Sequence, residues 1–148
     1  MGTYKIREAS SKLFISCLGN ESKTCTLHVN ARPIYLSYES GVYYMHLQTK
    51  DVNCYLCAKS KTKLVAAFCK TAKKEQFLDQ TIKFSLELMP KITSPDGSIV
   101  AKIFSFAEGK YLRCGFDESG DIRLFPDGLN SLLGSNFEFI KWFVSNYY

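Results

Sequence analysis

The chain has little tryptophan, histidine and proline, and it lacks a long apolar segment. Its 148 residues include one Trp, two His and four Pro, and the longest clear apolar run is Leu64 to Cys69. A spanning helix needs roughly 18 consecutive apolar residues, so we expect no membrane insertion. The first seven residues lack the apolar region of a secretory signal. This predicts either a cytosolic protein or a chain from which a leader or propeptide has been removed.

Recognisable catalytic motifs are also missing. His28 and His46 fall in predicted strands, away from any nucleophile arrangement, and the sequence has no phosphate loop, G-x-S-x-G or H-E-x-x-H. Cys54 and Cys57 form a C-x-x-C pair, but alternation along a strand points their side chains to opposite faces. We therefore expect no enzymatic activity, no metal site and no cofactor.

Apolar and aromatic residues are plentiful. Hydrophobic residues make up 46% of the chain and charged residues 22%, with 11 Phe and 9 Tyr. This composition and length predict one folded domain over residues 1–148 with a single core. Four of the six cysteines (Cys17, Cys54, Cys57 and Cys114) lie in or at the end of apolar runs. We interpret most of the six as free thiols, since a buried cysteine behaves as a small hydrophobe.

Apolar residues alternate with a period of two, which predicts strands. The pattern is clear over residues 82–88 and 43–47. Turn sequences recur between such runs, at Gly19-Asn20, Ser40-Gly41, Asp96-Gly97, Ser119-Gly120-Asp121 and Asp127-Gly128. Helical turns are expected only at 130–133 or 71–78. Many short strands with regular turns predict a barrel or a sandwich.

An internal repeat favours one architecture. The segments 12–17, 53–58 and 110–114 are versions of one strand, and each precedes a second strand, at 26–29, 63–66 and 122–125. Ile15 precedes Leu27 by twelve residues, as Leu112 precedes Leu124, and the middle unit is expected to be tighter. Three units of four strands predict an all-β fold, a β-trefoil of twelve strands with pseudo-three-fold symmetry. The alternative is a chance similarity within an unrelated sandwich.

Six lysines lie within sixteen residues, at positions 59, 61, 63, 70, 73 and 74. They could form a solvated face of a hairpin, or a patch that attracts an acidic receptor or a heparin-like polyanion. The exposed aromatics typical of single-strand nucleic-acid binding are not interleaved with them, so we expect no nucleic-acid partner.

The order of motifs resembles the interleukin-1 cytokine family over nearly the whole chain. The similar segments are 6–14, 26–30, 47–57, Phe104-Ser105-Phe106-Ala107, Tyr111-Leu112-Arg113-Cys114 and Asn136-Phe137-Glu138-Phe139. This resemblance implies a secreted ligand, exported without a signal peptide or held first as a cytosolic precursor. Such a ligand binds an immunoglobulin-like receptor, and an agonist also recruits an accessory receptor. We expect a monomer.

The resemblance also implies receptor-binding residues. Arg7, Ser11 and His28 match the surface that meets the first receptor domains, and Lys73, Lys74 and Glu75 match the loop that contacts the third. Asn136 matches a position that is acidic in agonists and basic in antagonists, so the sign of signalling stays open. Two alternatives remain: a heparin-binding trefoil resembling the fibroblast growth factors, and an intracellular trefoil binding module.

Overall fold

The computed structural model describes residues 2–16, 25–48, 53–58, 66–70, 78–90 and 98–142, with only the backbone described for Gln48, Asn53 and 66–70. This part of the chain contains twelve strands and a short 3-10 helix, η2, and no α-helix. The strands are β1 Gly2–Glu8, β2 Phe14–Ser16, β3 Thr26–His28, β4 Ile34–Glu39, β5 Val42–Gln48, β6 Asn53–Ala58, β7 Ala66–Lys70, β8 Phe84–Leu88, β9 Ile99–Ser105, β10 Lys110–Phe116, β11 Ile122–Gly128 and β12 Phe137–Lys141, and η2 is Gln80–Ile82. The prediction of an all-β chain is confirmed. None of the helices in this part of the chain has the length and apolar character that a membrane crossing needs.

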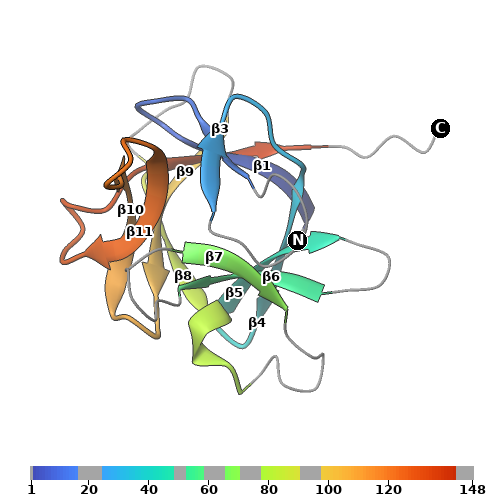
Figure 1. The fold of residues 1–148 in the computed structure, drawn as a ribbon. Coiled ribbons are helices and arrows are strands. Elements are labelled where there is room, and N and C mark those ends of the chain that lie inside the picture. The colour runs from blue at the N-terminus through green and yellow to red at the C-terminus, as the bar shows by residue number, and fades with distance from the viewer. Residues whose placement is uncertain are drawn as a thin grey trace, which may run out of the picture.

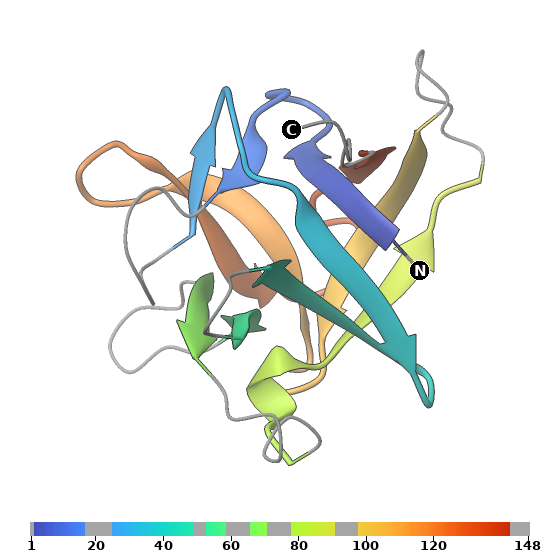
Figure 2. The same cartoon turned by 90° about the vertical axis from the view of Figure 1, so that its right-hand side faces the viewer.

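Six of the strands close a ring. Antiparallel pairs join β1 to β4, β4 to β5, β5 to β8, β8 to β9, β9 to β12 and β12 back to β1. Figure 1 looks into this ring, and Figure 2 shows it from the side. A closed ring leaves its six strands without a free edge on the ring itself.

The other six strands form three hairpins attached to the ring. The hairpins are β2–β3, β6–β7 and β10–β11, and their first strands pair with β1, β5 and β9 respectively. The same local arrangement therefore occurs three times along the chain, at the three places where the sequence repeats.

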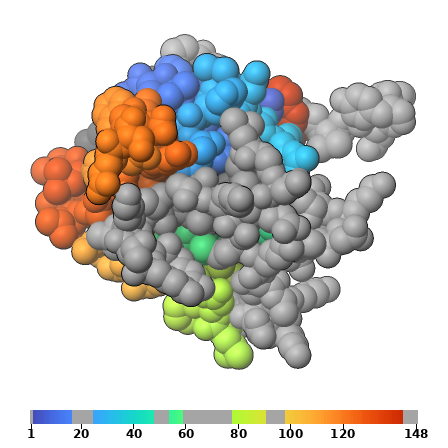
Figure 3. Space-filling view, in the orientation of Figure 1, coloured from blue at the N-terminus to red at the C-terminus, as the bar shows by residue number. Residues whose placement is uncertain are grey.

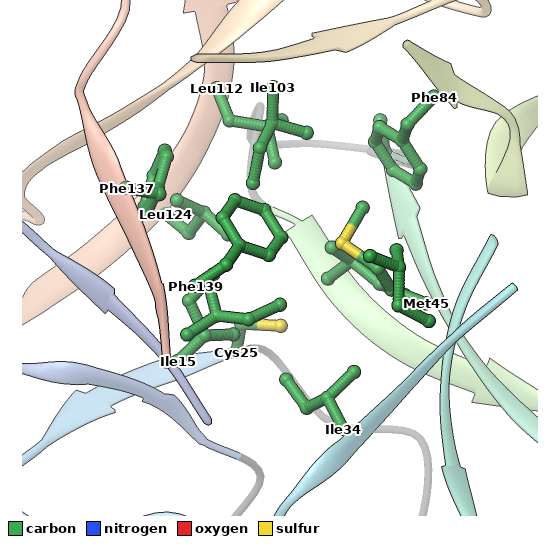
Figure 4. Close-up of a cluster of buried hydrophobic side chains, with 14 of the residues drawn as sticks. Ile15, Cys25, Ile34, Met45, Phe84, Ile103, Leu112, Leu124, Phe137 and Phe139 are labelled. Atoms are coloured by element: carbon green, nitrogen blue, oxygen red, sulfur yellow. The ribbon is translucent and has the colours of Figure 1, made fainter. Parts of the chain in front are cut away.

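One core fills the space between the ring and the hairpins. Figure 4 shows side chains from all three repeated units converging there, with Ile15 and Cys25 from the unit β1–β4, Met45 and Phe84 from β5–β8 and Leu124 from β9–β12. Ile15, Leu56, Leu112 and Leu124 are each 0% exposed. Burying one such side chain contributes about 1.5–3 kcal/mol, so each third of the chain depends on the other two.

The hairpin register corrects the expected size of the middle unit. Ile15 lies opposite Leu27, and Leu56 lies opposite Phe68, which is also twelve residues later. The prediction of a tighter middle unit was wrong, because its second strand begins at Ala66 and not at Lys63. The run from Leu64 to Cys69 has no alternating polar residue, so its pattern could not indicate a register.

The structure confirms some predicted turns and corrects others. Ser40 and Gly41 have φ of 52° and 83° and connect β4 to β5, as the mirror-image turn of a tight hairpin requires. The helical turn expected at 130–133 is present, since Asn130 O accepts from Leu133 N and Gly134 N. Asp127-Gly128 is not a turn but the end of β11. A Cβ on Gly128 would lie 2.9 Å from the backbone oxygen of Tyr111, so glycine is needed there for close packing.

The strand predicted at 82–88 begins two residues later in the structure, at Phe84. Ile82 ends η2, where Asp79 Oδ1 accepts from Thr81 N at 3.0 Å, and β8 begins at Phe84. Ile82 and Phe84 are both buried, but in different clusters. The alternation of apolar residues includes Ile82, because a pattern of hydrophobicity carries no information about Asp79, which caps η2.

The C-x-x-C pair faces two ways, as predicted. Cys54 packs in the main core, whereas Cys57 packs on the other side of β6 with Tyr44, Tyr55 and Ile82. Cys57 is disulfide-bonded, whereas Cys25, Cys54 and Cys114 are not in disulfides. The other cysteine side chains lie outside the described part.

Candidate recognition surface

A row of four residues crosses the strands near the start of the chain. Glu138 on β12 lies opposite Arg7 on β1, Arg7 lies opposite Phe14 on β2, and Phe14 lies opposite His28 on β3. Directly opposed residues of antiparallel strands project from the same face. The row therefore brings Arg7 and His28, two of the predicted receptor-binding residues, onto one surface.

Glu138 is the buried end of this row. Its side chain is 2% exposed, and its Oε2 accepts from Arg7 Nη2 at 2.9 Å while Oε1 accepts from Lys12 Nζ. The Arg7 guanidinium also lies 5.9 Å from the centre of the Phe14 ring. A carboxylate removed from water is costly unless it is paired, so these cations stabilise its charged form. Much of Arg7's charge is consequently directed inward.

A second carboxylate holds the turn between β1 and β2. Glu8 accepts from the backbone N–H groups of Ser10 at 2.6 Å and Ser11 at 3.0 Å, and its own backbone oxygen accepts from Lys12 N at 2.8 Å. Lys12 has a φ of 62°, which non-glycine residues seldom adopt. The turn is thus held at several points and presents an exposed Ser11.

Asn136 joins the same corner. Its backbone oxygen accepts from Ala9 N at 2.8 Å, so it lies against the turn that carries Ser11. Its side-chain Oδ1 is buried without a hydrogen-bond partner. Three predicted receptor-binding residues, Arg7, Ser11 and Asn136, therefore lie around the turn between β1 and β2, and His28 lies in the same row as Arg7, two strands away. We call this region the β1–β2 corner. Lys73, Lys74 and Glu75 lie outside the described residues, as do Lys59, Lys61 and Lys63 of the lysine cluster.

His28 is exposed but oriented. Its Nδ1 accepts from the backbone N–H of Asn30 at 3.1 Å. The same nitrogen lies 3.3 Å from the backbone oxygen of Asn30, so its contacts with Asn30 orient the ring in either tautomer.

Equivalent rows occur at the other two junctions between ring and hairpin. In one, Tyr35, His46 and Tyr55 stack across β4, β5 and β6, with ring centroids 4.8 Å and 5.0 Å apart. In the other, Phe104 lies between Ser85 and Tyr111, and its ring is 5.1 Å from that of Tyr111.

The chemistry of the three rows differs. Burial lowers the pKa of His46 below its ordinary 6.5, so the aromatic row through this residue is uncharged at neutral pH. The row through Phe104 contains no ionisable side chain except the phenol of Tyr111, whose pKa is raised by burial and by hydrogen bonding to Glu87. Among the three, only the β1–β2 corner carries fixed charges, and charges give a surface specificity for its partner.

Sequence reasoning missed the residues that support this corner. Glu8, Lys12 and Glu138 were not selected as functional positions. Glu138 stands between two core phenylalanines, and the period of two places it on the opposite face from them. No local pattern could identify its cations, because Arg7 and Lys12 are 131 and 126 residues away along the chain.

Comparison with known proteins shows the fold alone. No protein-family model matches the chain, and no curated protein sequence does. Its structure is similar to that of lysenin in complex with phosphocholine, with a TM-score of 0.67, 9% identity and 97% of this chain covered. The chain spans 45% of the length of that lysenin chain.

Two chlorophyll-binding structures are similar over nearly their whole length. The water-soluble chlorophyll protein of Brassica oleracea var. Botrytis with chlorophyll b has a TM-score of 0.66 and 11% identity, and type II water-soluble chlorophyll-binding proteins have 0.65 and 11%. In both cases the match covers 96% of this chain and 91% of the other. None of these structures is an interleukin-1 cytokine, so the resemblance to that family stays a prediction.

Proposed function

We propose that this chain is a β-trefoil binding protein, a secreted ligand similar to the interleukin-1 cytokines that binds an immunoglobulin-like receptor ectodomain through the β1–β2 corner. The trefoil assignment is supported by the closed ring of six strands with three attached hairpins, in which the pairing repeats three times. A ring of this kind holds loops at fixed separations, so little conformational entropy is lost when they bind.

The observation that carries the proposal is that four implied contact residues lie in one region of the molecule. Arg7, Ser11 and His28 are separated along the chain from Asn136, yet backbone pairing and the Glu138 ion pairs bring them together. A preorganised surface with exposed polar groups over a buried charge pair suits recognition of a protein partner.

The test is binding to immobilised ectodomains of interleukin-1-type receptors. Ser11→Arg should weaken binding at least about tenfold, because a bulky cation would occupy the centre of the contact, a loss of roughly 1.4 kcal/mol. His28→Ala should weaken it by a smaller factor. Ser119→Arg, the same change at an exposed serine in the β10–β11 turn, is the matched control and should bind as wild type does.

Two further results would decide between this proposal and its alternatives. Charge reversal at Lys73 and Lys74 tests the implied contact with the third receptor domain. If the wild-type protein binds no such ectodomain, the cytokine function is wrong. Retention on heparin that disappears when the lysines at 59–74 are neutralised would instead support the growth-factor-like alternative.

A further inference from the structure

Three leucines project into solvent from the connection between β11 and β12. Leu129, Leu132 and Leu133 are 70%, 92% and 51% exposed. We call residues 129–134, which carry them, the leucine turn. No Asp, Glu, Lys or Arg occurs from 128 to 137. Figure 3 shows the segment after β11, in orange-red, standing out at the left edge of the molecule.

Three backbone N–H groups of the leucine turn, those of Leu132, Leu133 and Gly134, are bonded within the turn. Asn130 Oδ1 accepts from Leu132 N at 3.0 Å, and Asn130 O accepts from Leu133 N at 3.1 Å and Gly134 N at 3.2 Å. The next N–H, that of Ser135, donates to Leu112 O at 3.0 Å. These four paired N–H groups, at and just after the two most C-terminal leucines, can leave water without becoming unsatisfied donors.

Contacts with neighbouring strands also hold the leucine turn in place. Lys102, which is 7% exposed, donates from Nζ to Gly134 O at 2.7 Å, and Ser131 Oγ donates to Glu87 Oε2 at 3.0 Å. A Cβ on Gly134 would lie 2.7 Å from Tyr111 Cβ, so the turn packs directly on β10. A buried lysine is costly in an ordinary connection, and here it stabilises the presentation of an apolar tip.

We propose that the leucine turn inserts into the surface of a phospholipid bilayer. A convex apolar tip with a paired backbone fits a deformable lipid surface, whereas a protein partner would need a matching hollow. The Tyr111 ring lies against Gly134 of the turn, and aromatic side chains favour the interfacial zone of a bilayer. The net charge of +5 adds attraction to anionic lipid. The expectation of no membrane insertion rested on the absence of a long apolar run, which a surface contact does not require.

The experiment is co-sedimentation of the whole protein with phosphatidylcholine vesicles, with and without phosphatidylserine. Wild type should bind both, and more tightly with phosphatidylserine. Leu132→Ser and Leu133→Ser should each weaken partitioning about tenfold, the factor expected when one leucine is lost from an apolar contact. Leu78→Ser removes a leucine that is 80% exposed elsewhere, and it should leave binding unchanged.

A second measurement reports depth directly. Leu132→Trp should keep vesicle binding and gain a blue-shifted emission on addition of lipid, measured against the signal of Trp142 in the wild type. Absence of wild-type binding to either vesicle, or an equal loss in the Leu78→Ser control, would overturn the proposal. A concentration-dependent dimer that Leu132→Ser abolishes, without any lipid binding, would show that a second copy covers the tip and would equally overturn it.

Discussion

Glu138 and Arg7 face each other across β12 and β1, joined by a 2.9 Å ion pair in which the carboxylate is almost fully buried and the guanidinium partly exposed. This pair holds the first strand to the last, and it lies directly beneath the proposed contact surface. Its loss should therefore affect both stability and binding.

Removal of one partner from this pair should be strongly destabilising. We expect Arg7→Met to lower the free energy of unfolding by about 3 kcal/mol, because Glu138 would keep its burial and lose its main cation. Lys12→Gly should cost less than about 1 kcal/mol, because that side chain is 52% exposed and glycine relieves the positive φ. Urea denaturation measures both. Equal losses in the two variants would contradict the assignment of Arg7 as the principal partner.

His46 should make stability depend on pH. Its folded pKa is lowered from 6.5 by burial, so protonation favours the unfolded chain. The stabilising effect is complete above pH 6.5 and is lost as the pH falls below that value. NMR titration should place the His46 midpoint below 6.5. In His46→Phe, which keeps the stacking between Tyr35 and Tyr55, the loss of stability on acidification should be smaller than in wild type.

Cys114 should resist alkylation although it is only partly covered. Burial, with the nearby charge of Glu8, raises the pKa of its thiol to about 12, so little reactive thiolate exists at pH 8. Labelling with iodoacetamide followed by peptide mass spectrometry should leave Cys114 unmodified in the native protein and modified after unfolding. Cys57 should be modified only after reduction, because it is disulfide-bonded. Rapid native labelling of Cys114 would contradict its placement.

The proton that Cys114 retains also sets a limit on alkaline stability. The ordinary pKa of the thiol is 9.0, whereas its pKa in the folded protein is about 12. The contribution of this group is therefore complete below pH 9 and is lost as the pH rises towards 12. Cys114→Ala should flatten this part of the stability profile.

The β4–β5 hairpin offers a local test. Ser40→Asn should raise the melting temperature, with a gain of about 0.5 kcal/mol, because Asn-Gly is the preferred pair when both central residues have positive φ. Gly41→Ala should cost about 1 kcal/mol at its φ of 83°. Thermal unfolding followed by circular dichroism measures both. No Cβ contact opposes Gly41→Ala, so a much larger loss would indicate a cause other than backbone strain.

Features of the fold that depend on residues close together in the sequence could be predicted. The boundaries of β6 at Asn53–Ala58, the turn at Ser40-Gly41 and the opposite faces of Cys54 and Cys57 follow from alternation and turn chemistry within a few residues. The start of β7 and the role of Gly128 were not predictable in this way. An unbroken apolar run carries no register, and the need for glycine at 128 comes from Tyr111 on another strand.

The β1–β2 corner depends even more on residues that are far apart in the sequence. The sequence by itself determined that the chain forms many short strands around one apolar interior, since the period of two and the glycine turns depend only on near neighbours. Only the tertiary structure decided that Glu138 is buried between Arg7 and Lys12, and that Asn136 lies against the turn between β1 and β2. Ion pairs and backbone contacts between the two ends of a chain arise from closure of the ring, and closure is a property of all its strands together.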